Sequence, residues 1–235
     1  MKAVIMAGGI GSRLKPLTND IPKPMVPIID KPVMQYIIEH LRDHNYKDIA
    51  VTLCYKPEVI MDYFGDGSRY GVNLRYFIER QPLGTAGSVK NAAEFLDEDF
   101  IIMSGDSFTD IDLGEFRNFH YESGGLFTMA IKYHKDCTGF GAVGCDEYGK
   151  VMSFIEKPKE KMSGFVNTGI YFLNREVLDM IPDGFYDFAK NLMPRLKDNL
   201  YAFKTDGYWS DIGTLVSYYD TNLMVANRLT MAGFA

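Results

Sequence analysis

The stretch "KAVIMAGGIGSRLKPLTNDIPKP", residues 2–24, combines an apolar run, a loop with three glycines, and basic residues placed close to prolines. The run at 2–7 has the length and composition of a buried β-strand. The glycines that follow it permit an irregular backbone, which leaves several N–H groups free to bind an anion. We therefore predict that the chain opens with a strand and an anion-binding loop.

The first half of the chain alternates between strand-like and helix-like segments. In 33–44 the apolar residues recur with helical spacing, and Pro57 and Gly65 lie at the two ends of a second helix. The predicted strands cover 2–7, 48–55, 72–79 and 99–106, and the predicted helices cover 33–44, 57–65 and 85–96. Such alternation is typical of an α/β fold, in which helices cover both faces of a mostly parallel sheet.

Strands dominate after about residue 125. Strands are predicted at 125–134, at 141–158 with a hairpin turn at 146–149, and at 165–174. Helices return at 175–181, 185–196 and 214–229. We predict a single α/β domain over residues 1–235, in which the second half, about 126–235, forms a strand-rich lobe over the first half, about 1–125.

Composition excludes several classes of protein. The net charge of -6 argues against general binding of nucleic acids, which requires a basic face, and no apolar run approaches the roughly 20 residues that span a membrane. Cys54, Cys137 and Cys145 form no CxxC pair, and together with the four histidines they lack the spacing of a zinc site. An odd number of cysteines without a disulfide framework predicts a cytoplasmic protein.

The glycine loop carries residues suited to phosphate. Gly8, Gly9 and Gly11 permit a positive φ and the close approach of a ligand. Arg13 adds a rigid fork of donors, and Lys23 adds a mobile charge between two prolines. Together they favour a polyphosphate site. A glycine turn with two surface cations remains the alternative interpretation of these residues.

Two common phosphate-binding motifs do not apply. The Walker A pattern is absent, and Leu14 stands where a dinucleotide fingerprint would place its third glycine. The sequence "GFGAVG" at 139–144 matches GxGxxG literally, but it lies among predicted strands and no helix follows it. We therefore expect no nucleotide site there.

Two aspartates are candidate metal ligands. Asp106 ends the predicted buried strand at 99–106, and Asp211 lies in "GYWSDIGT" before the last predicted helix. Mg²⁺ on a nucleotide is usually held by one or two carboxylates, and phosphate oxygens and water complete its shell. Asp106 and Asp211 would suit that role if they converge. The alternative is that each carboxylate caps a helix or stabilises a turn.

Two further polar motifs are candidate ligand contacts. Glu156 and Lys157 end a strand, where both could face one ligand only if the strand breaks, as Pro158 suggests. Their alternative role is an exposed charged turn. Gln81 could read the edge of a base through paired hydrogen bonds, and Thr85 could cap the helix that follows.

The stretch at 8–24 resembles the signature G-G-x-G-S/T-R-L-x-P-L-T…P-K-P of the sugar-nucleotide pyrophosphorylases, which are sugar-1-phosphate nucleotidyltransferases. The segments "QPLGTAGSV", "SGD", "EKP", "VNTGIYF" and "GYWSDIGT" are similar to later motifs of that family and follow in the same order. The resemblance covers nearly the whole chain, and it is greatest to the mannose-1-phosphate guanylyltransferases. It implies a Rossmann-like core and the conversion of a nucleoside triphosphate and a sugar 1-phosphate into a nucleotide sugar and pyrophosphate.

The resemblance also implies roles for particular residues. Arg13 would hold the departing phosphates, Lys23 the α-phosphate, Lys157 the phosphate of the sugar, and Asp106 and Asp211 would bind Mg²⁺. The first half would bind the nucleotide and the second half the sugar. The implied nucleotide contacts are Gly8, Gly9, Gly11, Ser12, Gln81, Gly84 and Thr85, and the implied sugar contacts are Glu156, Asn167 and Gly169.

The resemblance favours synthesis of GDP-mannose from GTP and mannose 1-phosphate. A UTP- or dTTP-dependent enzyme for glucose 1-phosphate is the alternative within the family, and a catalytically silent subunit that binds nucleotide sugars is an alternative of another class. Many family members continue into a left-handed β-helix or a mutase-like domain. This sequence stops at "MAGFA", so we expect no C-terminal β-helix domain, and homo-oligomerisation is left open.

Overall fold

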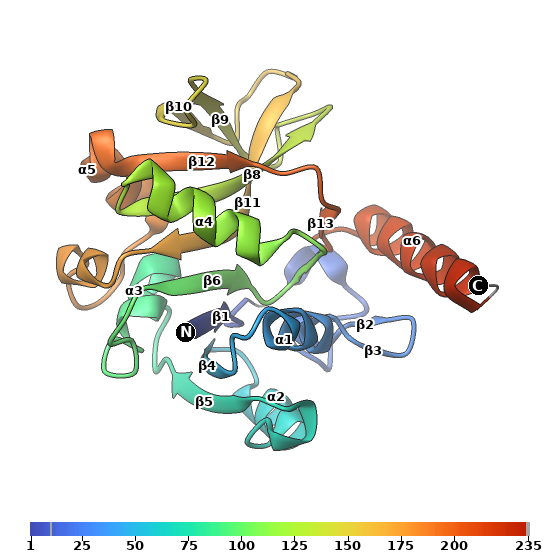
Figure 1. Cartoon of the computed structure of the whole chain (residues 1–235). Coiled ribbons are helices and arrows are strands. Elements are labelled where there is room, and N and C mark those ends of the chain that lie inside the picture. Colours follow the sequence, from blue (N-terminus) through green and yellow to red (C-terminus); the bar gives the residue numbers. More distant parts are fainter. Residues whose placement is uncertain (10, 234–235) are drawn as a thin grey trace.

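The computed structural model describes residues 1–9 and 11–233. Within these residues, a nine-stranded mixed sheet has the main order β10-β9-β11-β6-β1-β4-β5, and β8 joins it by pairing with β11 and β12 (Figure 1). Its strands are β1 (Lys2–Met6), β4 (Asp48–Leu53), β5 (Asn73–Ile78), β6 (Phe100–Ser104), β8 (Phe127–His134), β9 (Gly141–Cys145), β10 (Val151–Glu156), β11 (Gly164–Leu173) and β12 (Leu200–Lys204).

The first half of the sheet is parallel, and its inner strands β1, β4 and β6 are buried on both faces. Strand β1 pairs in parallel with β4 and β6, and β4 pairs in parallel with β5. Because side chains alternate along a strand, Val4 of β1 enters one apolar core while Ala3 and Ile5 enter the other. The predicted α/β sheet with helices on both faces is therefore confirmed.

Each core is closed by its own set of helices. The core around Ala3 and Ile5 includes buried side chains of α1 (Val33–Asp43), α2 (Pro57–Phe64) and α4 (Leu113–Ser123). The core around Val4 includes those of α3 (Gly84–Lys90) and α5 (Met193–Leu196). The sheet thus forms the middle of three layers.

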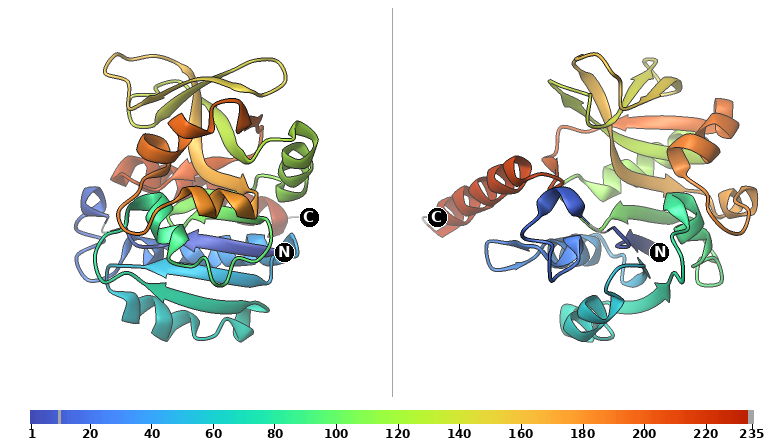
Figure 2. Two further views of the ribbon diagram at one scale, coloured as in Figure 1. Left: turned by 90° about the vertical axis from the view of Figure 1, so that its left-hand side faces the viewer. Right: turned by 180° about the vertical axis from the view of Figure 1, so that it is seen from behind.

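The second half of the chain extends the same sheet. Strand β11 pairs antiparallel with β6, and this pairing joins the two halves. Strands β9 and β10 form the predicted hairpin, and they lie at the end of the molecule opposite β5 (Figure 2). The strand-rich lobe therefore continues from the parallel half through shared backbone hydrogen bonds.

Several short elements follow no strong sequence pattern and were not predicted. Strand β7 (Ser107–Thr109) pairs with β13 (Trp209–Asp211), and β2 (Pro27–Ile28) pairs with β3 (Lys31–Pro32). Helix α4 and strand β12 were also missed. In α4 the side chain of Asp112 caps the backbone N–H groups of Gly114 and Glu115, which is a signal that could have located its start.

The predicted helices form with some changes in type and length. The helix predicted at 85–96 ends at Lys90, and turns follow it. The segment at 175–181 is the 3₁₀-helix η4 (Arg175–Met180), and 185–196 divides into the π-helix η5 (Phe188–Leu192) and α5. The other short 3₁₀-helices are η1 (Ser12–Leu14), η2 (Lys23–Met25), η3 (Ser68–Tyr70) and η6 (Lys197–Asn199).

The last helix, α6 (Leu215–Gly233), projects from the body of the molecule (Figures 1 and 2). Its buried residues Thr221 and Val225 lie on one side, while Val216 and Tyr219 are exposed on another. Over the residues that the structure describes, no helix has both the length and the apolar character needed to cross a membrane.

A buried histidine ties α4 to the sheet. The Nδ1 atom of His120 lies 2.8 Å from Thr128 Oγ1, and its Nε2 atom lies 2.7 Å from Asn174 Oδ1. Burial lowers the pKa of His120 below its usual 6.5, although the hydrogen bond to Asn174 opposes this shift. The folded protein therefore favours the neutral imidazole.

We expect the free energy of unfolding to fall as the pH decreases from 7 to 5, because the unfolded chain protonates this histidine before the folded protein does. One such group contributes a slope of at most about 1.4 kcal/mol per pH unit. Urea unfolding of the wild type and of His120→Gln at pH 5, 6, 7 and 8 measures it. The wild type should lose more stability below pH 7 than the variant. Between pH 7 and 8 the free energies of unfolding of the two proteins should change by the same amount. Equal slopes below pH 7 would contradict the assignment.

Candidate active site

The glycine loop connects β1 to η1 at the carboxyl end of the strand. Gly11 has a φ of 70°, and it caps η1 with its carbonyl oxygen, which also accepts a 2.7 Å hydrogen bond from Thr18 Oγ1. A Cβ at Gly11 would lie 2.9 Å from the Cβ of Lys23. Glycine at this position is therefore needed so that the loop can pack against Lys23. A Cβ at Gly9 would meet nothing within 4 Å.

A small cavity lies beside this loop. It has a volume of about 210 Å³ and is lined by Gly9, Gly11, Ser12, Arg13, Lys23, Asp106 and Gly213. Ligands of open α/β sheets bind at the carboxyl ends of the strands, which is where β1 and β6 end here. The structure thus brings together six residues that the sequence pointed to, and it adds Gly213.

Lys23, Asp106 and Asp211 form a buried ionic cluster. The Nζ atom of Lys23 donates to Asp106 Oδ2 and, at 2.8 Å, to Asp211 Oδ1. Only 6% of Lys23 is exposed. Asp211 does not lie in the break before α6, as the sequence suggested, but in β13, whose pairing with β7 places it opposite Ser107. The expected convergence of the two aspartates is present.

The charges in this cluster shift one another's pKa values. Burial opposes the charge of Lys23, but the two carboxylates outweigh burial and raise the pKa of Lys23 above 10.5. Burial also opposes ionisation of Asp106, but Lys23 and the hydroxyl of Ser104 lower the pKa of Asp106. Burial and the neighbouring charge of Asp106 raise the pKa of Asp211. The pKa values of the two carboxyl groups move in opposite directions because the groups share one cation and their negative charges repel.

Arg13 lies at the rim of the cavity. Its side chain is exposed, and a Cβ at Gly213 would lie 3.2 Å from Arg13 Nη2 and 2.8 Å from Asp211 Oδ2. Glycine at 213 therefore leaves space for the guanidinium and the carboxylate to approach the same point. Arg13 makes no salt bridge with any residue in the described part of the chain.

The motif at 81–88 serves a structural purpose that the sequence did not reveal. A strap formed by residues 184–188 crosses the start of α3, where the carbonyl oxygen of Tyr186 accepts hydrogen bonds from the N–H groups of Ala86 and Gly87. A Cβ at Gly84, whose φ is 73°, would lie 2.7 Å from that oxygen. Gly84 is thus required by packing against the strap.

Thr85 also binds the strap. Its hydroxyl donates to Asp187 Oδ2 at 3.0 Å and accepts from the N–H of Phe188 at 2.9 Å. The alternative interpretation of Thr85 as the cap of α3 is wrong, because Leu83 occupies that position and no side chain caps the helix. Both hydrogen bonds of Thr85 point toward the second half of the chain.

Glu79 is a candidate binding residue that sequence reasoning missed. It follows β5 and is 9% exposed, and its Oε2 atom accepts a 3.0 Å hydrogen bond from the N–H of Leu83. Its Oε1 atom lies 3.6 Å from the Cβ position at Gly8. Burial raises the pKa of Glu79 above its usual 4.5. An acid two residues before Gln81 was visible in the sequence, but nothing there indicated its burial.

Glu79 and Gln81 share a hollow of about 450 Å³ beside the end of β5. Ile78, Glu79, Arg80, Gln81, Leu83 and Asn91 line it. Gln81 is exposed at its edge, whereas the carboxylate of Glu79 reaches back to the glycine loop. The predicted base-binding residue thus lies near the loop but outside the ionic cavity.

The residues predicted to bind the sugar lie on β10 and β11. The side chain of Asn167 donates to Tyr171 Oη at 2.9 Å and accepts from the N–H of Gly169 at 3.1 Å. Gly169 has a φ of 77°, and its Cβ position lies 3.4 Å from Ser104, next to Asp106 in sequence. This bend in β11 therefore borders the ionic cluster.

Strand β10 ends at Glu156, as the proline at 158 suggested. Lys157 has a φ of 49°, and its Nζ atom lies 3.8 Å from Glu156 Oε1. The side chain of Lys157 is 64% exposed. Both charges can consequently turn toward one ligand, which a continuous strand would prevent.

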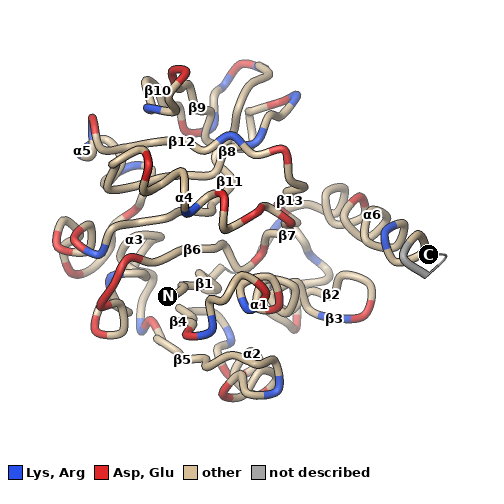
Figure 3. The backbone as a smooth tube through the Cα atoms, viewed as in Figure 1, with Lys and Arg blue, Asp and Glu red and all other residues tan. Residues whose placement is uncertain are grey.

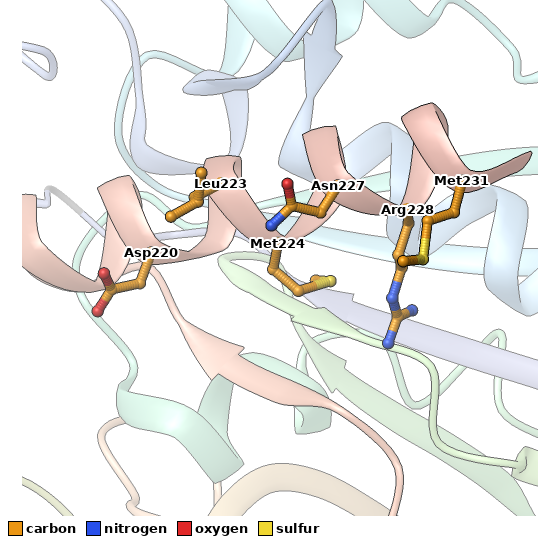
Figure 4. Close-up of a pocket in the computed structure, with 6 residues that line it drawn as sticks. All are labelled: Asp220, Leu223, Met224, Asn227, Arg228 and Met231. Atoms are coloured by element: carbon orange, nitrogen blue, oxygen red, sulfur yellow. The ribbon is translucent and has the colours of Figure 1, made fainter. Parts of the chain in front are cut away.

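A further hollow of about 430 Å³, larger than the cavity beside the glycine loop, lies along α6. Figure 4 shows the side chains that line it, which are Asp220, Leu223, Met224, Asn227, Arg228 and Met231. All come from one helix, and Arg228 forms a salt bridge with Asp110. We place the candidate active site at the glycine loop because charged groups of both signs from three distant segments of the chain converge there.

Comparison with known proteins identifies the family of the chain. A family model described as nucleotidyl transferase matches residues 2–228. Over 97% of its length the chain is 38% identical to a UTP–glucose-1-phosphate uridylyltransferase from Synechocystis. Over 93% it is 36% identical to a D-glycero-alpha-D-manno-heptose 1-phosphate guanylyltransferase from Campylobacter jejuni, and over 91% it is 34% identical to a mannose-1-phosphate guanyltransferase from Yarrowia lipolytica.

The relatives differ in length. The chain spans 64% of the uridylyltransferase and 61% of the mannose-1-phosphate guanyltransferase, but 97% of the heptose-phosphate enzyme. Among solved structures, HddC from Yersinia pseudotuberculosis matches with a TM-score of 0.85 and 30% identity, over 95% of this chain and 99% of that one. HddC has also been solved in complex with GMP-PN.

Replacing Gly11 with alanine should destabilise the protein, because alanine would have to adopt a positive φ and would press against Lys23. A residue other than glycine in this conformation costs about 1–3 kcal/mol. Urea unfolding of Gly11→Ala measures the loss, and Gly9→Ala is the matched control because its Cβ has open space. Equal stability of the two variants would show that the packing on Lys23 is unimportant.

Proposed function

The chain belongs to the nucleotidyl transferase family, and we propose that it joins a nucleoside triphosphate to a sugar 1-phosphate and releases pyrophosphate, with GTP and mannose 1-phosphate as its substrates. The observation that carries the reaction class is the ionic cluster beside the glycine loop, where Arg13, Lys23 and Asp106 line one cavity and Asp211 binds Lys23 beside it. Its residues can bind phosphates, and the described residues that line the cavity include no cysteine and no serine paired with a histidine.

The proposed chemistry needs no covalent intermediate with the protein. An oxygen of the sugar phosphate attacks the α-phosphorus of the triphosphate, and the bond from that phosphorus to the bridging oxygen of the leaving pyrophosphate breaks. Catalysis then consists of positioning the two anions and stabilising the charge that develops on the leaving group. In this proposal Arg13 holds the departing phosphates, Lys23 binds at the α-phosphate, and Lys157 holds the phosphate of the sugar.

The two aspartates suit Mg²⁺. Their carboxylates converge on one ammonium group and thereby already hold a cation between them. The described residues contain no group of three or more His, Cys, Asp or Glu side chains that could hold a metal, so phosphate oxygens and water would complete the shell, as Mg²⁺ prefers. Such an ion would screen the charge between the two phosphorylated substrates.

Glu79 supports the choice of guanine. A carboxylate accepts hydrogen bonds only, and the Watson–Crick edge of guanine presents two adjacent donors, the N1–H and the N2 amino group. Uracil and thymine present a single N–H between two carbonyl oxygens, which a carboxylate repels. With Oε2 held by Leu83, the Oε1 atom faces the glycine loop and is available to a base beside it. We therefore assign base selection to Glu79 instead of Gln81.

The relatives support the choice of sugar. The guanylyltransferases among them are named for mannose 1-phosphate or for a heptose 1-phosphate of manno configuration. Asn167, in the bend of β11 next to the ionic cluster, and Glu156 at the end of β10 are the side chains that we assign to the sugar hydroxyls. The uridylyltransferase relative makes UTP and glucose 1-phosphate the second candidate pair.

The proposed setting of the reaction is the cytoplasm. Cys54, Cys137 and Cys145 are free thiols, as a reducing compartment allows. The partners of the protein are then its two small phosphorylated substrates, and a nucleic acid or a membrane is not among them. Figure 3 shows basic and acidic residues interspersed along the chain.

Release of pyrophosphate in the presence of Mg²⁺ tests the proposal. We expect the highest kcat/KM for GTP with mannose 1-phosphate in a grid of GTP, UTP, dTTP and ATP against mannose 1-phosphate and glucose 1-phosphate. A highest value for UTP or dTTP with glucose 1-phosphate would overturn the substrates and keep the reaction. A protein that binds nucleotide sugars but turns over no pair would be a silent family member.

Replacing Glu79 with glutamine should reduce the preference for GTP over UTP by at least about tenfold, because an amide can donate to a carbonyl of uracil where a carboxylate cannot. The ratio of the two kcat/KM values measures this preference, so it is insensitive to a general loss of activity. Gln81→Ala is the matched control in the same hollow and should leave the ratio unchanged. A changed ratio in Gln81→Ala alone would return base selection to Gln81.

A further inference from the structure

The two carboxylates proposed to hold Mg²⁺ are already neutralised by a group of the protein itself. Lys23 Nζ donates to both Asp106 and Asp211, and only 7% of its side chain is exposed. The remaining oxygen of Asp106 accepts a hydrogen bond from Ser104 Oγ. Each of the two oxygen atoms of Asp106 thus already accepts a hydrogen bond from the protein.

The balance of charge in the cavity opposes the entry of a further cation. Arg13 and Lys23 carry two positive charges in the lining of the cavity, and Asp106 in the lining and Asp211 beside it carry two negative charges, so these four groups balance one another. A divalent ion added to this cavity would face two cations at short range in a partly buried site, where such repulsion is strong. A bound triphosphate would make the net charge of the cavity negative and would thereby favour the entry of a cation.

The chain holds the backbone of Lys23 in place and leaves its side chain able to move. Lys23 begins η2 between Pro22 and Pro24, and its Cβ packs against Gly11. The stem of a lysine is flexible and its ammonium group is a compact charge, so it can exchange one anionic partner for another. A phosphate of the nucleotide in the same cavity is such a partner.

We propose that Lys23 acts as the built-in counter-cation of Asp106 and Asp211 and keeps divalent metal ions out of the site until phosphates draw the ammonium group away. This inference rests on the proposed function for the role of the metal. The free protein then binds Mg²⁺ or Mn²⁺ only weakly, and the metal enters together with the nucleotide or after it. Because coupling between ligands is reciprocal, occupation of the metal site in turn strengthens nucleotide binding.

Titration of the nucleotide-free full chain with Mn²⁺ tests this inference. Mn²⁺ prefers oxygen ligands in octahedral geometry, as Mg²⁺ does, and its free concentration is read by electron paramagnetic resonance. We expect weak binding to the wild type and binding at least about tenfold tighter to Lys23→Gln, because this variant removes the competing charge. Lys23→Arg keeps the charge and should stay weak.

Two further variants test whether the tighter binding of Mn²⁺ arises at this pair of carboxylates. Lys23→Gln combined with Asp106→Asn should lose the gained affinity, because one carboxylate of the site is then neutral. Lys150→Gln is the matched control, since it removes a lysine that is paired with Asp198 far from the cavity. The thermal midpoint with and without Mn²⁺ provides a second readout, and it should rise with the metal only in Lys23→Gln.

Tight binding of Mn²⁺ to the nucleotide-free wild type would overturn the inference, and this measurement needs no variant to fold. An active enzyme with that result would leave the proposed function intact. A protein that is silent in the substrate grid, but whose Lys23→Gln variant gains the metal site, would contradict the proposed function and keep the inference. An unchanged affinity in a folded Lys23→Gln variant would also overturn it.

Discussion

One buried ammonium group between two carboxylates holds this site together. Lys23, Asp106 and Asp211 come from three distant parts of the chain and meet within hydrogen-bonding distance. Removal of Lys23 would leave two neighbouring carboxylates without their cation, which is strongly destabilising. Each residue reaches the cluster by a different route: Lys23 from the stiff segment after the glycine loop, Asp106 from the end of β6, and Asp211 from β13. The order β6-β1 in the sheet and the β7–β13 pairing therefore serve this one contact.

The same sheet also explains how two halves of different character share one site. Strand β11 pairs with β6 and carries Asn167 and Gly169 to the border of the cluster, while the strap at 184–188 returns to bind the start of α3. Glycines in the loop and in the motif at 81–88 allow these close approaches. Gly11 lies against Lys23 and Gly84 against Tyr186, so each serves the packing of the protein as well as any ligand.

The sequence revealed the parts of the molecule whose signal is local or repeated. Alternation of apolar runs located the parallel strands, and the glycines, Arg13, Lys23, Asp106 and Asp211 were recognised before any of their contacts were visible. The sequence did not predict the contacts between distant segments. Nothing local shows that Asp211 lies in a strand, that Thr85 binds the strap, or that Glu79 is buried against the glycine loop. Helix α4 was missed because few of its residues are apolar and one of its buried side chains is a histidine.

The separation between the ionic cavity and the hollow at Glu79 has a consequence for specificity. Phosphates are common to every nucleoside triphosphate, so the residues of the cluster can stabilise the reaction without distinguishing one base from another. Discrimination requires a buried polar group that the wrong base leaves unpaired. In the proposed function Glu79 is such a group, and it lies outside the cluster but against the same glycine loop. Under that proposal, a substitution at this one position would alter the choice of base and leave the phosphate-binding residues of the cluster intact.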